Sequence, residues 1–498
     1  RRACELAPKD AEPARLLAYV LKRLNRPDEA RDVARGILVR DPGDLQAAVV
    51  EALALPAVPD SIEALARARE AYAKGLDSLV AREAVFATDA AQVLKLQSEN
   101  FHLASQGGND RDLQAKYAGL LARLGALAEP RYYEPRPRRR LAKGARLRVG
   151  LLSGFFRDCT AGKYFRSWAA GLDRSRFEVF VYYTAYVRDA FSEGLAKEIE
   201  HHRHIVDTVP RIADVVLADA LDVLVFPEVG MDTSGYLLAG MRLAPVQCAG
   251  WGHPVTTGQG AIDWYLTCGA MEPEGAESHY TERLQRLPGI GTRYARPGPA
   301  SSKSRDELGL PEGTLYLCPQ SLFKVHPDND ALYASVLAAD PAGRLVFVED
   351  QDPPLTRDFR ARLAKALPIE RTHVVPRSGH ADSLRLNGLC DVMLDTLHWS
   401  GGNTSLDALA MGLPVVTLPG AFMRGRQSAG MLCLAGVPEL VAKDTEDYVR
   451  LATRLGTDKA WRREVAERLE AGVPRLFDDP APVVALSAFL EGLFEPRG

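Results

Sequence analysis

The sequence lacks a long hydrophobic run, and it lacks an excess of basic residues. No apolar stretch reaches the ~20 residues that a helix needs to cross a bilayer, so we expect no membrane span. Lys and Arg total 62 against 65 Asp and Glu, which gives a formal net charge of −3. The basic segment RPRRR at 136–140 is too short to change this balance, so nucleic acid is not an expected partner.

The sequence also lacks a regular cysteine pattern. Its 7 cysteines are scattered along 498 residues and contain no C-x-x-C pair. An odd, irregularly spaced set is typical of a reducing compartment rather than of a disulfide framework, so we expect a cytoplasmic protein. The length suggests about three domains, and the hydrophobic share of 46% is ordinary for a globular chain.

Residues 1–128 are rich in Ala and Leu and have helical periodicity. Pro8-Lys9-Asp10 and Pro42-Gly43-Asp44 stand at the same phase, 34 residues apart. A period of this length with proline at the junction is typical of tetratricopeptide repeats, which contain one helical hairpin each. A helical domain without repeats is the alternative. Residues 129–145, rich in proline and arginine, are predicted to be a linker.

From residue 146 onward the pattern alternates between buried strands and helices. The first series of predicted strands comprises 147–154, 177–184, 221–228, 245–252 and 263–268. After a Gly/Pro/Ser-rich break, a second series comprises 315–319, 344–350, 372–377, 391–396 and 413–420. This pattern predicts two Rossmann-like domains, 146–298 and 299–498, that face a cleft; ligands of such sheets bind beyond the carboxyl ends of the strands.

A polar turn, SGGNTS at 400–405, separates one predicted strand from an apolar helix. Backbone N–H groups at a helix start attract phosphate, and glycine lets phosphate approach the backbone closely. The carboxylate of Asp407 lies one turn further and suits ribose hydroxyls. An ordinary capped helix is the alternative interpretation. The candidate phosphate-binding residues of the turn are Gly401, Gly402, Asn403, Thr404 and Ser405.

Further polar side chains follow other predicted strands. Lys324, in FKVHP, could neutralise a diphosphate, although a solvated surface lysine is the alternative. His253, in GWGHPVTTG, would face the cleft from the first domain or would only brace its loop. Arg424 and Arg426, in MRGRQS, are either cations of the cleft or partners in surface salt bridges.

Taken in order, these segments resemble the catalytic region of the O-GlcNAc transferase/SPINDLY family, glycosyltransferase family 41. The resemblance extends over roughly 147–450, and predicted helical repeats before it fit the same arrangement. The sequence motifs GHPVTT and GGNTS also resemble the corresponding motifs of bacterial adhesin N-glucosyltransferases. The segments that carry the resemblance are LRVGLLSGFF, RFEVFVYY, RLAPVQCAGWGHPVTTG, FKVHP, DVMLDT, GGNTSLDAL, GLPVVTLPG and RGRQSAG.

The resemblance implies an α/β GT-B fold, preceded by an all-α tetratricopeptide-like region. It implies a UDP- or GDP-linked sugar as the donor substrate, no cofactor, and inverting, metal-independent transfer to a protein side chain. The acceptor would be a Ser or Thr hydroxyl on a protein that the helical repeats bind. Transfer to Asn, and a non-catalytic scaffold with a vestigial sugar-nucleotide site, are the alternatives. A nucleotide-sugar epimerase of the same fold is disfavoured, because a small-molecule enzyme needs no peptide groove.

The resemblance also implies roles for single residues. Lys324 matches the lysine that contacts the donor diphosphate, Thr404 matches a phosphate-binding threonine, and Asp407 matches the carboxylate that holds the ribose. The stretch VVPRSGH, 374–380, falls where the family encloses the nucleobase, so Pro376 and His380 are further candidates.

Two stretches depart from the pattern of the animal enzymes. FRDCTAG, with Asp158, replaces a His-Pro segment, and Gly402-Asn403 stands where those enzymes carry His-Thr. The transferred sugar is therefore open, whereas the diphosphate site is retained. The base for the acceptor is open too, with His253 and Asp158 as candidates. D-x-D patterns at 328–330 and 350–352 would suggest a metal-dependent enzyme, but Asp328 reads as the start of a helix after Pro327.

Overall fold

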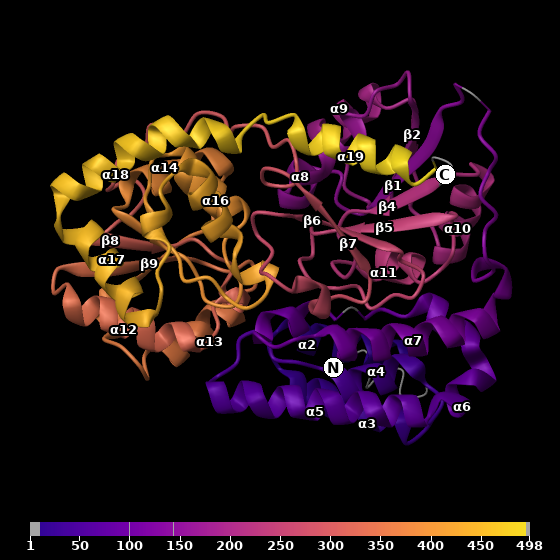
Figure 1. Ribbon diagram of the computed structural model, residues 1–498. Helices are drawn as coiled ribbons and strands as arrows, with labels where there is room; N and C mark the ends of the chain where they lie inside the picture. The colour runs from indigo at the N-terminus through magenta and orange to yellow at the C-terminus, as the bar shows by residue number, and fades with distance from the viewer. Residues whose placement is uncertain (1–9, 99, 143, 495–498) are drawn as a thin grey trace.

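The computed structural model describes residues 10–98, 100–142 and 144–494. Figure 1 shows a helical region along one side of two α/β domains that lie next to one another. None of the described helices is long and apolar enough to cross a membrane. Pro8 and Lys9, which belong to the first of the two predicted repeat junctions, lie outside the described residues.

The helical region begins with two hairpins and then becomes irregular. Asp44 caps the second hairpin because its Oδ1 accepts a hydrogen bond of 2.8 Å from the N–H of Ala47. Asp10, at the matching phase, accepts one of 2.9 Å from the N–H of Glu12. The helices are α2 (Glu12–Arg23), α3 (Pro27–Leu38), α4 (Leu45–Leu53), α5 (Ile62–Ala81), α6 (Glu83–Phe86) and α7 (Arg111–Ala128), with the 3₁₀ segments η1 (Ala87–Lys95) and η2 (Phe101–Gln106) before α7.

The segment that follows is pinned to the first α/β domain. Tyr132 is buried, and its hydroxyl donates a hydrogen bond of 2.9 Å to Asp214. Arg139 pairs with the fully buried carboxylate of Asp222 at 2.6 Å. The helical region is therefore fixed to the α/β part at both ends of this segment.

The first sheet is parallel and has seven strands in the order β3-β2-β1-β4-β5-β6-β7. Near-continuous apolar runs form its central strands, because helices cover both faces of such a sheet. The strands are β1 (Leu147–Ser153), β2 (Phe177–Tyr183), β3 (His201–His204), β4 (Val223–Phe226), β5 (Val246–Gly250), β6 (Trp264–Cys268) and β7 (Arg283–Leu287). The helices are α8 (Thr160–Ala170), α9 (Ala190–Glu198), α10 (Val209–Ala218) and α11 (Thr233–Ala239).

The second sheet is parallel and has five strands in the order β10-β9-β8-β11-β12. Its strands are β8 (Thr314–Cys318), β9 (Gly343–Val348), β10 (Thr372–Val375), β11 (Val392–Leu394) and β12 (Val415–Val416). Its helices are α12 (Asp328–Ala339), α13 (Pro353–Leu363), α14 (His380–Leu389), α15 (Asn403–Ala410), α16 (Gln427–Ala435), α17 (Thr445–Thr457) and α18 (Lys459–Gly472). The predicted pair of parallel α/β domains is confirmed, and Asp328 does begin a helix.

The last helix, α19 (Ala481–Gly492), returns to the first domain. It contacts α8 and β7 (Figure 1), and Glu491 at its end forms an ion pair with Arg176. The chain therefore passes between the two α/β domains twice, once between β7 and β8 and once just before α19. The exact domain boundaries stay predictions.

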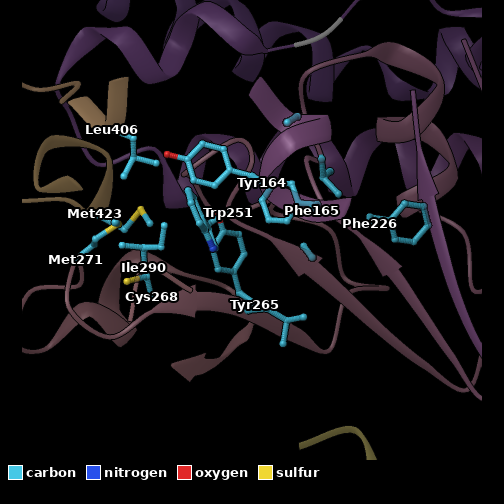
Figure 2. Close-up of a cluster of buried hydrophobic side chains, with 14 of the residues drawn as sticks. Tyr164, Phe165, Phe226, Trp251, Tyr265, Cys268, Met271, Ile290, Leu406 and Met423 are labelled. Atoms are coloured by element: carbon cyan, nitrogen blue, oxygen red, sulfur yellow. The ribbon is translucent and has the colours of Figure 1, made fainter. Parts of the chain in front are cut away.

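Buried aromatic side chains join the two domains. Figure 2 shows Tyr164 of α8 and Trp251, which follows β5, next to Leu406 and Met423 from the second domain. The rings of Tyr164 and Trp251 meet edge to face with centroids 4.7 Å apart. Tyr164 and Trp251 also line the cavity described next.

Candidate functional site

A cavity of ≈300 Å³ lies where the three regions meet. Its lining includes Tyr164 and Trp251 from the first domain, Lys324 and Thr404 from the second, and Phe101 from the helical region. The second-domain residues follow the carboxyl ends of β8 and β11. The cavity thus lies where ligands of parallel α/β sheets bind.

The turn between β11 and α15 is held from beneath by a buried carboxylate. Asp395 accepts hydrogen bonds of 2.7 Å from the N–H of Gly401 and from the hydroxyls of Ser400 and Thr417. Burial raises the pKa of Asp395, whereas these donors lower it. Asp395 was not singled out from the sequence, although an aspartate at a strand end before a glycine turn is a usable signal.

The five predicted residues of the turn have different surroundings. Gly402, Asn403 and Thr404 line the cavity. Ser405 lies beneath the turn, where its Oγ is 2.7 Å from that of Ser428. Gly401 is tied down by Asp395 as described. A Cβ at Gly402 would lie 2.6 Å from Oε1 of Gln427, so the glycine makes room for that amide beside the cavity.

Thr404 and Lys324 present a hydroxyl and an ammonium to the same cavity. The Oγ1 of Thr404 is buried and has no hydrogen-bond partner among the described residues. Lys324 is half-buried, with its Nζ 4.6 Å above the ring of Trp399, and no ion pair of this lysine occurs in the described part of the chain. Burial lowers the pKa of Lys324 to about 8. An anion bound here would restore favourable interactions for both groups.

Asp407 and His380, which the resemblance places at the ribose and the nucleobase, lie next to one another. The Oδ2 of Asp407 accepts a hydrogen bond of 2.8 Å from the amide of Asn403 and lies 3.0 Å from Nε2 of His380. Its other oxygen is buried and has no partner among the described residues. Burial raises the pKa of Asp407, although His380 acts in the opposite direction. One carboxylate oxygen is therefore available to accept from a ligand hydroxyl.

His380 faces a second cavity, of ≈530 Å³, between the two α/β domains. Tyr294 and Asp158 also line it, and Tyr294 forms a hydrogen bond with Asn403. Pro376 is exposed on the loop after β10 and is not among the described residues that line either cavity.

The two candidate bases are not among the described residues that line the cavity beside Lys324. His253 is 3% exposed and packs against Phe101 and Trp399 at centroid distances of 5.2 and 6.0 Å. Burial lowers its pKa to about 3, and neither ring nitrogen has a hydrogen-bond partner in the described part of the chain. Asp158 is mostly exposed, and its carboxylate lies 3.1 Å from Nζ of Lys163.

The arginines of MRGRQS do not line the cavity beside Lys324. Arg426 is half-buried and donates a hydrogen bond of 3.0 Å to the carbonyl of Gly420. Arg424 is buried and lies 3.2 Å from Asp110 of the helical region, which is also 2.7 Å from Arg69. Arg424 thus ties the second domain to the helical region, which neither of its sequence interpretations anticipated.

Two facing Rossmann-like domains with a ligand-sized cavity between them are the GT-B arrangement of glycosyltransferases. Residues 106–291 and 296–475 match the family described as glycosyl transferase family 41, and the chain belongs to that family.

Among its relatives is the probable UDP-N-acetylglucosamine–peptide N-acetylglucosaminyltransferase SPINDLY of Arabidopsis thaliana, which is 30% identical over 258 residues. That match covers 50% of this chain and 28% of the relative, so the chain spans less than a third of the relative's length. The UDP-glucose:protein N-beta-glucosyltransferase of Actinobacillus pleuropneumoniae serotype 7 is 27% identical over 296 residues, 57% of this chain and 46% of that protein.

Among solved structures, a mutant of the O-GlcNAc transferase of Thermobaculum terrenum superposes with a TM-score of 0.73. It is 25% identical in sequence, and the match covers 99% of this chain and 92% of that one. The similarity includes the helical region, which the matched family range mostly omits.

Proposed function

We propose that this protein transfers a sugar from a UDP- or GDP-linked donor to a side chain of a protein acceptor, with a Ser or Thr hydroxyl as the preferred acceptor. The observation that carries the proposal is the convergence of Lys324 and Thr404 on one cavity. The hydroxyl of Thr404 has no hydrogen-bond partner, and the ammonium of Lys324 has no ion pair, among the described residues. Asp407 and His380 extend this set toward the second cavity, where the nucleoside would lie.

The proposed reaction is a single displacement. The acceptor oxygen attacks the anomeric carbon from the side opposite the diphosphate, and its bond to that carbon forms as the carbon–oxygen bond to the diphosphate breaks. The bonding electrons pass to the diphosphate, and the configuration at the carbon is inverted. The ammonium of Lys324 and the N–H groups at the start of α15 stabilise this growing charge. They supply the positive charge that a divalent ion supplies elsewhere, so we propose that transfer needs no metal.

A base must accept the proton that the acceptor hydroxyl loses during the displacement. With a pKa of about 3, His253 is a weak base at neutral pH. Asp158 is a carboxylate in the neighbouring cavity, paired with Lys163. Neither lines the cavity beside Lys324, so we assign the proton to neither and use Asp158→Asn and His253→Phe to compare them.

The helical region is the proposed acceptor-binding part. Phe101 of η2 reaches the cavity beside Lys324, so an acceptor held by these helices would be close to the sugar. A further cavity of ≈610 Å³ lies between α2 and η1 and is lined by Arg15, Tyr19, Gln46 and Lys95, among others. Stacked helical hairpins form surfaces of this kind for extended peptides.

The test is a screen of the full chain against UDP- and GDP-sugars, with donor hydrolysis and transfer to cell-extract proteins as the readouts. We expect one nucleotide-sugar to be consumed and one class of side chain to gain the sugar by peptide mass spectrometry. Sugar on Asn would establish the N-glucosyltransferase alternative, which the relative from Actinobacillus favours. Nucleotide binding without turnover of any donor would instead support the alternative of a non-catalytic scaffold.

A further inference from the structure

Two histidines and an aspartate meet in the second domain, outside the cavity beside Lys324. His326 lies between β8 and α12, Asp328 is the first residue of α12, and His398 lies in the loop after β11. One ligand atom from each lies within 4.8 Å of the other two. The Oδ2 of Asp328 is 2.6 Å from Nε2 of His398 and 3.3 Å from Nδ1 of His326.

The atoms of this His-Asp-His cluster are rich in lone pairs. The backbone N–H of Asp328 donates a hydrogen bond of 3.1 Å to Nδ1 of His326, so that nitrogen acts as an acceptor. It nevertheless lies beside a carboxylate oxygen of the same aspartate. Two acceptors at this separation repel one another unless a cation lies between them. The hydrogen bond from His398 relieves only part of this charge.

The backbone of His398 gives a second, independent indication. Its φ of 67° is in the left-handed region, which residues other than glycine seldom adopt. Its ring packs on the ring of His326 with centroids 4.3 Å apart, and Gly107 of the helical region lies directly against it. The ring of His398 is therefore held beside His326 and Asp328, which limits the rearrangement that metal binding would require.

We propose that His326, Asp328 and His398 bind a divalent transition-metal ion of the Zn²⁺ type, with water as the fourth ligand. Two imidazoles and a carboxylate are ligands that Zn²⁺ prefers. Metal–ligand distances of about 2.0–2.2 Å in a tetrahedron separate the ligand atoms by roughly 3.3–3.6 Å. The separation of 3.3 Å between Asp328 and His326 already lies in that range, whereas the separation of 2.6 Å between Asp328 and His398 must widen, which rotation of their side chains would allow.

Exposure and proton movement are compatible with binding. The side chains of Asp328 and His398 are 36% and 33% exposed, which leaves an entry path and room for water, whereas His326 is 6% exposed and anchors the site. When the ion binds, the proton on Nε2 of His398 moves to Nδ1 or to solvent, and the freed lone pair coordinates the ion. The single lone pair on Nδ1 of His326 turns from the N–H of Asp328 to the ion, so that hydrogen bond is exchanged for the metal bond.

The proposed ion has a place distinct from the donor. The three ligands are not among the described residues that line the cavity beside Lys324. The ion would instead join the segment after β8, which carries Lys324, to the segment after β11, which leads into the turn at 400–405. It would therefore stabilise the protein against unfolding without contacting the diphosphate.

The test uses the tag-free full chain, freed of metal with a chelator. Co²⁺ is titrated and followed by visible absorption, Zn²⁺ is then added as a competitor, and thermal unfolding is recorded with and without Zn²⁺. We expect one equivalent of Co²⁺ with the intense absorption of four-coordinate cobalt, its displacement by Zn²⁺, and a higher melting temperature in Zn²⁺. His398→Gln and Asp328→Asn should each weaken binding by on the order of a hundredfold or more, because a ligand counts for at least as much as its supporting residues.

The matched control is His201→Gln. His201 is also one-third exposed, and its Nε2 lies 3.1 Å from the carboxylate of Glu178. It belongs to no group of three possible metal ligands among the described residues. It should bind Co²⁺ like the unmodified protein. Equal binding by His398→Gln, or cobalt that stays six-coordinate, would overturn the proposal. If Asp328→Asn fails to fold, His398→Gln decides the question. None of these readouts depends on sugar transfer.

Discussion

The two α/β domains contribute to the cavity in different ways. The second domain contributes a polar turn that Asp395 fixes from beneath through three hydrogen bonds of 2.7 Å, together with Lys324. The first domain contributes chiefly aromatic side chains. The hydroxyl of Tyr164 and the indole N–H of Trp251 are buried and have no hydrogen-bond partner among the described residues.

This difference indicates that the two domains would contact different parts of a donor. A turn that is already rigid binds an anion without being reorganised, which favours stabilisation of a charge that grows during reaction. Unsatisfied donors on an aromatic wall instead suit a sugar, whose hydroxyls accept hydrogen bonds and whose C–H faces pack on rings. The second domain thus suits the constant part of a donor, and the first suits the part that varies.

The largest expected effect concerns the positive charge that the second domain contributes to the cavity. Lys324→Ala should lower turnover by about 10²–10³-fold, because the ammonium acts most strongly on the charge that develops on the diphosphate. Lys324→Arg should restore it only in part, since the guanidinium is larger and planar. Steady-state kinetics would show this against Lys443→Ala, an exposed lysine of the same domain that should remain unaffected. Near-normal turnover of Lys324→Ala would mean that the active site has been misplaced.

The next effect separates the two hydroxyls of the turn. Thr404→Val should weaken binding of a nucleoside diphosphate by about ten- to a hundredfold, because a hydrogen bond to a charged group contributes roughly 1.5–3 kcal/mol. Ser405→Ala should leave that affinity nearly unchanged, since Ser405 faces Ser428 beneath the turn. Isothermal titration measures both. Unchanged affinity in Thr404→Val would indicate that the turn only caps α15.

A pH effect follows from the pKa of about 8 for Lys324 in the free protein. Below this pH the side chain is an ammonium, and above it the charge is lost, so affinity for a nucleoside diphosphate should fall as pH rises through 8. With one proton involved, the slope should not exceed about tenfold per pH unit. Titrations from pH 6.5 to 9.5 would reveal it. Lys324→Arg should abolish this fall, because arginine stays charged throughout.

The smallest expected effect concerns the first domain. His253→Phe should lower turnover by less than about tenfold, because the buried imidazole stays neutral and packs among aromatic rings. Loss of a true general base would cost about 10²–10⁴-fold. Parallel kinetics on Asp158→Asn would rank the two candidates, and a large loss in His253→Phe would make the histidine the base despite its burial.

Much of the fold could be predicted from local patterns. All ten predicted strands form, because each is a short apolar run followed by polar or glycine-rich turns. The edge strand β7 was not predicted, since its RLQRL sequence is only partly buried and offers no continuous apolar run. The start of α15 was located because helix starts, glycines and phosphate binding are connected locally.

The rest of the site depends on contacts between distant parts of the chain. Arg424 is neither a cation of the cleft nor a surface residue, because Asp110 of the helical region pairs with it inside the protein. Phe101 reaches the cavity from a short 3₁₀ segment with no distinguishing motif. His253 was placed in the correct loop, but its burial among rings follows only from the way in which three regions pack.

The return of α19 to the first domain limits how the two α/β domains can move. With a single connection, the chain itself would restrict the relative motion of the domains less. Two connections cross between the domains, one before β8 and one before α19. Rotation about the axis through both connections is therefore the easiest relative motion of the two domains. A cross-link between α19 and α8 should therefore leave opening intact, whereas cutting the chain before α19 should add new directions of movement.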